Sequence, residues 1–209
     1  MTIKCDFNIK RTDFSLSFNA ELSGNKITII KGKSGCGKTS LLRLMAGLDY
    51  SPNNTFIVNS QIFQQNDIFI PAEKRPIGYV GQESCLLPFM NIEKNIAFAQ
   101  KRRSCSDYAL PNLDELFSIF DLHHCKLKLP DQLSSGETQR ALVIQSIMNT
   151  PNLFLFDEAF SAIDEQRKSI ILDYLMDYLE QRNLPAIYVS HDSEELKYIR
   201  SDISIQLTT

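Results

Sequence analysis

The amino-acid sequence predicts an α/β fold with a buried parallel sheet, an antiparallel β-flap at the N-terminus and an α-helical subdomain inserted in the middle of the chain. Short apolar runs typical of buried parallel strands recur along the sequence. Segments with apolar residues at three- and four-residue steps, typical of amphipathic helices, stand between these runs. The first residues alternate between apolar and polar side chains, as strands with one exposed face do.

The N-terminal part of the chain predicts the flap and the first strand of the parallel sheet. Apolar and polar side chains alternate over Cys5–Ile9 and again over Phe14–Phe18, which predicts short antiparallel strands. The β-branched run Ile27–Ile30 predicts a strand that ends at Lys31-Gly32. Apolar residues at helical spacing from Leu41 to Leu48 then predict a helix. This part of the chain is therefore a strand, a glycine-rich turn and a helix.

The remaining strands and helices are predicted further along the chain. Buried parallel strands are predicted at Ile77–Val80, Leu153–Phe156 and Ala186–Val189. Helices are predicted at Asn91–Ala99, Leu113–Phe120, Glu137–Met148 and Glu165–Gln181. The polar stretch 51–66 predicts a long loop. Because helices collected in mid-chain favour an inserted subdomain over another crossover, we assign 83–146 to a helical subdomain, and 1–82 with 147–209 to the core and its flap.

The composition is that of one domain of moderate size. Of the 209 residues, 43% are hydrophobic and 22% charged, so we treat 1–209 as a single domain. No uninterrupted apolar run exceeds four residues, which excludes a membrane-spanning helix. Residues 1–11 lack the apolar stretch of a signal peptide, so a cytoplasmic location is expected. A net charge of −3 offers no basic excess, which disfavours nucleic acid as a partner.

A phosphate-binding motif follows the first predicted parallel strand. The segment Gly32-Lys-Ser-Gly-Cys-Gly-Lys38-Thr39 matches G-x-x-x-x-G-K-[ST] between a strand and a helix. Its glycines let the backbone wrap a phosphate chain at a helix N-terminus, where the helix dipole also favours an anion. Lys38 is expected to reach the β- and γ-phosphates and Thr39 to ligate Mg²⁺. The residues expected to bind the nucleotide are Gly32, Lys33, Ser34, Gly35, Cys36, Gly37, Lys38, Thr39 and Ser40.

Two carboxylates follow the predicted strand Leu153–Phe156. Ligands of parallel sheets gather at the carboxyl ends of the strands, where Asp157 and Glu158 stand. Asp157 suits a hold on Mg²⁺, directly or through water, and Glu158 could accept a proton from a water aligned on the γ-phosphate. Alone, such a pair also fits a helix cap or a solvated turn. Beside the phosphate loop, it predicts a site that hydrolyses a nucleotide.

Five further segments resemble, in order, those of the ATP-binding cassette family, the ATPase subunits of ABC transporters. They are Pro71–Arg75, Gln82 as the Q-loop, Leu133-Ser-Ser-Gly-Glu137 as the signature, Ser161-Ala-Ile-Asp164 as the D-loop, and His191 as the switch histidine. Each alone is a weak signal, but their common order and spacing cover nearly the whole chain. The resemblance implies a RecA-like P-loop NTPase core with a β-flap and a helical subdomain.

The resemblance also implies how ATP is bound. In this family the signature of one subunit closes over the nucleotide of the other, so a head-to-tail homodimer with two ATP molecules at its interface is expected. The residues implied for that contact are Ser134, Ser135, Gly136 and Asp164. Phe14 is the candidate for stacking on adenine, and a plain core role for it stays open.

Catalytic and metal roles follow from the same resemblance. Glu158 is implied as the general base, His191 as a contact to the γ-phosphate from its own subunit, and Gln82 as a contact to the metal or the lytic water. The implied Mg²⁺ ligands are Thr39, Gln82 and Asp157.

Transport would require other subunits. Since no membrane span is expected, the resemblance implies integral membrane permease subunits that dock near Glu83–Met90, together with a solute-binding protein. The chain would then lie peripherally on the inner face of the cell membrane. Glu137, the segment Ile68–Arg75 and the ending Pro185–His191 resemble molybdate-type oxyanion importers, so molybdate or tungstate is the expected solute. Those importers often carry a C-terminal regulatory domain, whereas 18 residues follow His191 here.

Three positions depart from the family pattern. Ser135 replaces a glycine of the signature, Ala159 a proline after the glutamate, and Gly81 an aromatic residue. None removes a phosphate contact or the general base, so an active ATPase is expected. Two alternatives stay open: a soluble ABC ATPase without a transport role, and a weakly hydrolysing, nucleotide-binding regulatory subunit.

Three neighbouring residues invite a metal interpretation. His123, His124 and Cys125 are adjacent, but the sequence shows no second ligand pair at metal spacing. We therefore predict no metal site at this position.

Overall fold

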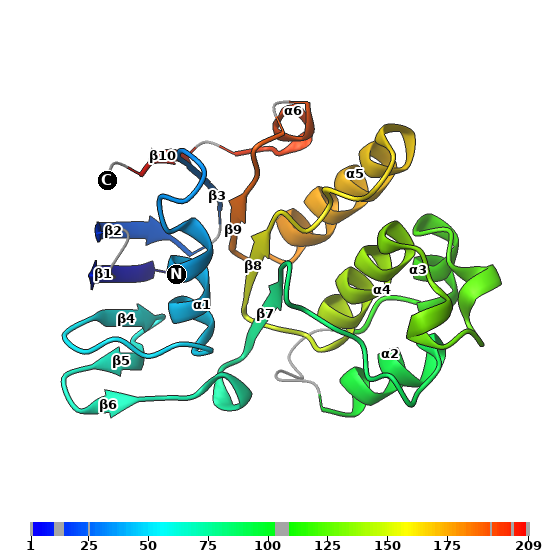
Figure 1. Cartoon of the computed structure of the whole chain (residues 1–209), viewed down its shortest axis with the longest axis horizontal. Helices are drawn as coiled ribbons and strands as arrows, with labels where there is room; N and C mark the ends of the chain where they lie inside the picture. The colour runs from blue at the N-terminus through cyan, green and yellow to red at the C-terminus, as the bar shows by residue number, and fades with distance from the viewer. Residues whose placement is uncertain are drawn as a thin grey trace.

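A computed structural model describes residues 2–10, 15–24, 26–102, 109–192, 194–201 and 203–207, and within them the strands form one antiparallel and one parallel sheet of five strands each. The antiparallel sheet has the order β2-β1-β4-β5-β6, and the parallel sheet the order β10-β3-β9-β8-β7. Figure 1 shows the antiparallel sheet at one side of the molecule and the helices α2, α3 and α4 gathered at the other. The predicted α/β class with a flap and a helical subdomain is confirmed.

The antiparallel sheet is the predicted β-flap. Its strands are β1 (Thr2–Lys10), β2 (Ser15–Ser23), β4 (Thr55–Val58), β5 (Gln61–Gln65) and β6 (Ile68–Phe69). Phe7 pairs with Phe18 across β1 and β2, and both side chains are buried. The prediction of a long loop over 51–66 is wrong, because β4 and β5 lie in this stretch. Two short apolar runs, Phe56–Val58 and Ile62-Phe63, interrupt this polar stretch. Phe56, Val58 and Phe63 are buried in the cluster that the flap shares with α1, and β4 pairs with β1.

The parallel sheet carries the predicted strands and one more. It consists of β3 (Ile27–Lys31), β7 (Ile77–Val80), β8 (Leu153–Asp157), β9 (Ala186–Val189) and β10 (Ile203–Gln206). Helix α1 (Lys38–Ala46) packs between the flap and one face of this sheet, in a cluster that includes Leu153 and Leu155. Helix α5 (Glu165–Gln181) packs on the other face with Phe154 and Phe156. Successive side chains of β8 point to opposite faces of the sheet, so this strand contributes apolar residues to the clusters on both faces.

The helical subdomain contains α2 (Ile92–Lys101), α3 (Leu113–Ile119), α4 (Ser135–Met148) and the short turns η2 (His123–Cys125) and η3 (Pro130–Gln132). Asparagine side chains cap the N-termini of α2 and α3. Asn91 accepts a hydrogen bond from Lys94 N at 2.9 Å, and Asn112 accepts one from Asp114 N at 2.9 Å. The inner faces of α2, α3 and α4 share one apolar cluster with α5 and the parallel sheet. A short helix α6 (Glu195–Tyr198) follows β9.

The segment Pro71–Arg75 joins α1 to the flap through a turn, η1 (Ala72–Lys74). Arg75 is 4% exposed and donates hydrogen bonds to Leu44 O at 2.9 Å and Met45 O at 2.6 Å, at the end of α1. Its guanidinium also lies 5.5 Å from the ring centre of Phe63. Burial lowers the pKa of Arg75 to about 10. This segment therefore has a structural role in connecting two layers.

None of the helices that the structure describes has both the length and the apolar character needed to cross a membrane.

Candidate active site

The phosphate loop lies between β3 and the first turn of α1. Gly35 and Gly37 have φ angles of 78° and 93°, in the left-handed region that favours glycine. A Cβ at Gly32 would lie 2.7 Å from Cys36 Sγ, so the loop packs too closely for a side chain there. Gly37 stands at the N-cap of α1 and brings no side chain to cap it. The first N–H groups of α1 therefore face outward as anion donors.

Lys38 places its ammonium group inside this loop. Its side chain is buried, and Nζ donates hydrogen bonds to Gly32 O at 2.9 Å and to Lys33 O at 2.8 Å. The charge thus lies at the N-terminus of α1, where the helix dipole adds to the attraction for an anion. Lys33 and Ser34 are exposed at the tip of the loop, and Ser40 is half-buried on α1.

Asp157 lies at the carboxyl end of β8 and is 1% exposed. The hydroxyl of Tyr79 donates to its Oδ2 at 3.3 Å, and the hydroxyl of Thr39 donates to the same carboxylate. Burial raises the pKa of Asp157, and the charge of Glu158 adds to the rise, while the two hydrogen bonds oppose it. A carboxylate and a hydroxyl held together beside the phosphate loop are the oxygen ligands that suit Mg²⁺.

Gly81 makes room for the ring of Tyr79. A Cβ at position 81 would lie 2.4 Å from Tyr79 Oη and 2.6 Å from its Cζ. Any larger residue would push the phenol away from Asp157. Glycine, where the family pattern has an aromatic residue, therefore allows Tyr79 to reach the carboxylate.

Gln82 and His191 converge on Glu158. Gln82 Nε2 donates to Oε2 at 3.0 Å, and His191 Nε2 lies 3.1 Å from Oε1. Because a carboxylate only accepts, His191 donates through Nε2. Glu158 has a φ of 53°, and its own N–H donates to Val189 O at 2.9 Å. The structure thus brings together three side chains that follow β7, β8 and β9.

The residues on either side of His191 are held by hydrogen bonds. Lys168 in α5 is buried, and its Nζ donates to Asp192 Oδ2 at 2.9 Å. Ser190 Oγ accepts from Asp192 N at 3.0 Å and donates to the buried Glu195 at 3.1 Å. The loop that carries His191 is therefore tied to α5 by groups that the sequence did not single out.

The signature forms the N-terminus of α4. Ser134 is the N-cap: its Oγ accepts from Glu137 N at 3.2 Å, and its own N–H donates to Glu137 Oε2 at 2.7 Å. Ser135 is exposed in the first turn. Gly136 is buried against the D-loop, since a Cβ there would lie 2.7 Å from Ala162 O. This contact explains why glycine occupies position 136.

Gln139 connects the signature helix to the D-loop, a role that sequence reasoning missed. Its Nε2 donates to Ser161 Oγ at 3.2 Å, and its Oε1 accepts from Ala162 N at 2.8 Å. The one available signal was its place one turn after Gly136 on the same helix. Asp164 is the N-cap of α5 and accepts from Arg167 N at 3.1 Å.

The two halves of the predicted nucleotide contact come from different parts of the chain. Figure 1 shows α1, which follows the phosphate loop, on the flap side of β7 and β8, and α4, which begins at the signature, on the other side. Phe14, the candidate for adenine stacking, lies outside the described residues.

The fold and the site define an ATP-binding cassette. Residues 16–161 match the family model described as ABC transporter, and the chain belongs to this family. The matched range includes the phosphate loop, Asp157 and Glu158, and the signature.

Similar proteins include molybdenum import ATP-binding proteins. The molybdenum import ATP-binding protein ModC of Methylococcus capsulatus is 34% identical over 194 residues, which cover 93% of this chain and 54% of that protein. ModC of Pseudomonas savastanoi is 37% identical over 188 residues, which cover 88% of this chain and 51% of that protein. The chain spans about half the length of the curated relatives it matches.

Solved structures share the fold. A dimeric ATP-binding cassette in a post-hydrolysis state bound to ADP and Pi has a TM-score of 0.79 at 21% identity, with 99% of this chain and 94% of that chain covered. A bacterial Atm1-family ABC exporter with ATP bound also has a TM-score of 0.79 at 21% identity, with 99% of this chain and 37% of that chain covered.

Proposed function

We propose that this chain is the ATP-hydrolysing subunit of an ABC importer and works as a homodimer. The observation that carries the proposal is the convergence of Gln82 and His191 on the carboxylate of Glu158, next to Asp157. Such an arrangement holds a general base in place between two polar partners. A helix cap or a solvated turn would not need either partner.

In the proposed reaction, the phosphate loop binds the triphosphate of ATP through its N–H groups and Lys38. Glu158 accepts a proton from a water molecule that attacks the γ-phosphorus, and ADP leaves with the bridging oxygen. Gln82 orients Glu158, and the Nε2 hydrogen of His191, which points to Glu158 without nucleotide, would turn to the γ-phosphate when ATP binds. The products are ADP and inorganic phosphate.

Mg²⁺ is the proposed cofactor with ATP. Thr39, Asp157 and Gln82 would hold it, since their hydroxyl, carboxylate and amide oxygens form a hard donor set beside the phosphate loop. The burial of Asp157 supports this role, because a cation would offset the cost of a buried negative charge. When bound, the ion supplies neutralisation of the charge that develops on the phosphates.

The dimer is proposed because the signature and the phosphate loop lie apart within one chain. Ser134, Ser135, Gly136 and Asp164 would meet the nucleotide held by a second copy of the chain. Ser134 is already fixed by its capping box, and the first turn of α4 offers N–H groups toward an anion. ATP would then hold the two copies together, and hydrolysis would release them.

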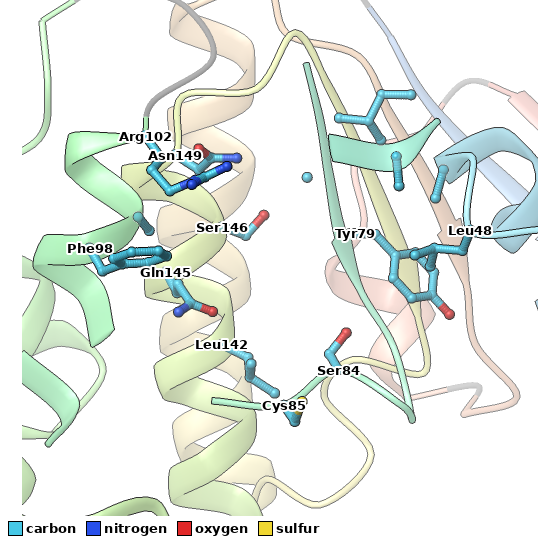
Figure 2. Close-up of a pocket in the computed structure, with 15 residues that line it drawn as sticks. Leu48, Tyr79, Ser84, Cys85, Phe98, Arg102, Leu142, Gln145, Ser146 and Asn149 are labelled. Carbon is cyan, nitrogen blue, oxygen red and sulfur yellow. The ribbon is translucent and has the colours of Figure 1, made fainter. Parts of the chain in front are cut away.

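A cavity of about 370 Å³ between α2, α4 and β7 is the proposed docking site for a permease subunit. Figure 2 shows Phe98 and Leu142 on one side of it and Leu48 and Tyr79 on the other, with Cys85 at one end. Phe98 and Leu48 are exposed large apolar side chains. The lining also includes polar side chains such as Arg102, Gln145 and Asn149, so an amphipathic helix of a membrane partner is the occupant that it fits.

The docking site is close to the catalytic residues along the chain. Ser84 and Cys85 line the cavity and directly follow Gln82 and Glu83, and Glu83 forms an ion pair with Arg43 in α1. A partner that moves this loop would therefore change the contact between Gln82 and Glu158. This connection is the proposed route between transport and hydrolysis.

Molybdate or tungstate is the proposed solute, on the strength of the ModC relatives, and a solute-binding protein would deliver it. The chain would lie on the inner face of the cell membrane through its permease subunits.

Release of phosphate from ATP tests the activity. We expect wild-type protein to hydrolyse ATP with Mg²⁺, and His191→Ala and Gln82→Ala to lower kcat at least tenfold. His123→Ala, which changes an exposed histidine away from the site, is the matched control and should keep wild-type kcat. An inactive wild-type dimer would favour the nucleotide-binding regulatory alternative.

Co-purification tests the transport role. We expect a hydrophobic membrane permease to be recovered with the wild-type chain, and Phe98→Glu to abolish the recovery without lowering basal ATPase activity. Recovery of ribosomes or nucleic acid instead would contradict the importer proposal.

A further inference from the structure

A cluster of ligand-forming side chains lies at the first turn of α4, outside the active site. His124 and Cys125 belong to η2, and Glu137 belongs to α4. His124 Nε2 donates to Glu137 Oε1 at 2.9 Å, and Cys125 Sγ donates to the same oxygen at 3.0 Å. One ligand atom from each residue lies within 4.8 Å of the others. The sequence predicted no metal site here because it shows no second ligand pair at metal spacing, and Glu137, which completes the cluster, lies twelve positions beyond Cys125.

The cluster combines three chemical types of ligand. Imidazole nitrogen, cysteine sulfur and carboxylate oxygen bind Zn²⁺ at about 2.0–2.3 Å, so ligand atoms around a tetrahedral ion lie roughly 3.3–3.8 Å apart. The observed separations of 2.9 and 3.0 Å need only a small expansion to reach that range. Such a mixed set favours a borderline-soft cation over Mg²⁺ or Ca²⁺.

The surroundings of the cluster determine its coordination. Cys125 is buried, whereas the side chain of His124 is 52% exposed, so one side of the cluster is open to water. Glu137 Oε2 is occupied by the N–H of Ser134, which leaves Oε1 for a cation. Lys128 Nζ lies 3.6 Å from Oε1 and is the competing charge.

We propose that His124 Nε2, Cys125 Sγ and Glu137 Oε1 bind Zn²⁺, with water as the fourth ligand. On binding, Cys125 releases its proton to solvent, His124 holds its single ring proton on Nδ1, and the ammonium of Lys128 turns to solvent. Three protein ligands and one open position make a site that exchanges its metal, unlike the closed four-ligand sites that structural zinc occupies. The ion joins η2 to the first turn of the signature helix.

Co²⁺ is the spectroscopic probe for this site, used with reduced, tag-free protein without nucleotide. We expect one Co²⁺ per chain, with tetrahedral d–d bands and a thiolate charge-transfer band that Zn²⁺ abolishes by displacement. Cys125→Ser should lose the charge-transfer band, and the exposed change His124→Gln should weaken Co²⁺ binding at least tenfold. The matched controls Cys85→Ser and His123→Gln should keep both the bands and the affinity.

Two further outcomes decide the proposal. Lys128→Met should tighten Co²⁺ binding, since it removes the competing ammonium, and Zn²⁺ should raise the Tm of wild-type protein but not of His124→Gln. The metal-free Tm of Cys125→Ser shows whether that variant is folded, and His124→Gln carries the test if it is not. Absence of the bands in wild type, or their survival in His124→Gln with unchanged affinity, would overturn the proposal.

Discussion

Removing one partner of the ion pair between Lys168 and Asp192 should lower the stability of the protein much more than removing the other. Lys168 is 5% exposed at its side chain, and its Nζ lies 2.9 Å from Asp192 Oδ2 and 3.5 Å from Glu165 Oε2. Burial alone would lower the pKa of Lys168, but the hydrogen bond to Asp192 and the nearby carboxylates outweigh it and raise the pKa. Asp192→Asn therefore leaves a buried ammonium group without its main partner.

The expected loss of stability follows from the exposure of the two groups. Leaving a fully buried charge unpaired costs about 3–5 kcal/mol. The side chain of Asp192 is 38% exposed, so water screens part of this cost, and Glu165 remains close. We expect Asp192→Asn to lower the free energy of unfolding by about 1–2 kcal/mol, or roughly 2–8 °C in Tm for a chain of this size.

Lys168→Met is the matched variant. It removes the charge but keeps an unbranched side chain of similar length, so we expect stability within about 1 kcal/mol of wild type. The double variant should resemble Lys168→Met, because Asp192→Asn then leaves no buried charge behind. Since Asp192 adjoins His191, each single variant should also lower kcat more than it raises KM.

Thermal unfolding of the four proteins, followed by ATPase kinetics, makes the comparison. Equal and additive losses of stability in the two single variants would refute the reasoning that the buried ammonium is the costly group. An unchanged kcat in both would refute the positioning of His191 through Asp192.

Two other changes test the packing and charge of the site. Gly136→Ala should lower the free energy of unfolding by about 1–3 kcal/mol and slow hydrolysis, because its Cβ would meet the carbonyl oxygen of Ala162 at 2.7 Å. Tm and kcat measure these two effects. Unchanged values of both would show that the D-loop moves away from the added methyl group without cost. Asp157→Asn should raise the Tm of nucleotide-free protein at pH 7, because burial raises the pKa of Asp157 and so penalises its charged form. The advantage should shrink as the pH falls toward that raised pKa and the wild-type carboxyl is protonated, and a gain that grows at lower pH would contradict the sign.

The local parts of the fold and site could be predicted from the sequence. The phosphate loop is contiguous between Gly32 and Thr39, and Asp157 with Glu158 directly follows an apolar strand, so a short window contains the necessary pattern. The strands β4 and β5 were missed because their apolar runs, Phe56–Val58 and Ile62-Phe63, are short and stand in an otherwise polar stretch. In addition, β4 pairs with β1, which is far away in the sequence.

The supporting contacts could not be predicted, because they join distant positions. Gln139 meets Ala162 across 23 positions, and Lys168 meets Asp192 across 24. The same holds for Glu137, which the sequence placed in the signature and which the fold also brings to Cys125. Each of these contacts depends on how helices pack, and no local pattern contains that information.

The ATP-dependent dimer is the central claim, and the variant Glu158→Gln tests it most directly. The amide keeps the shape of the side chain but cannot accept the proton of the attacking water, so ATP should bind and remain intact. Light scattering after size-exclusion chromatography should then show a dimer with ATP and Mg²⁺, and a monomer with ADP. A variant that binds ATP and Mg²⁺ yet stays monomeric would contradict the account.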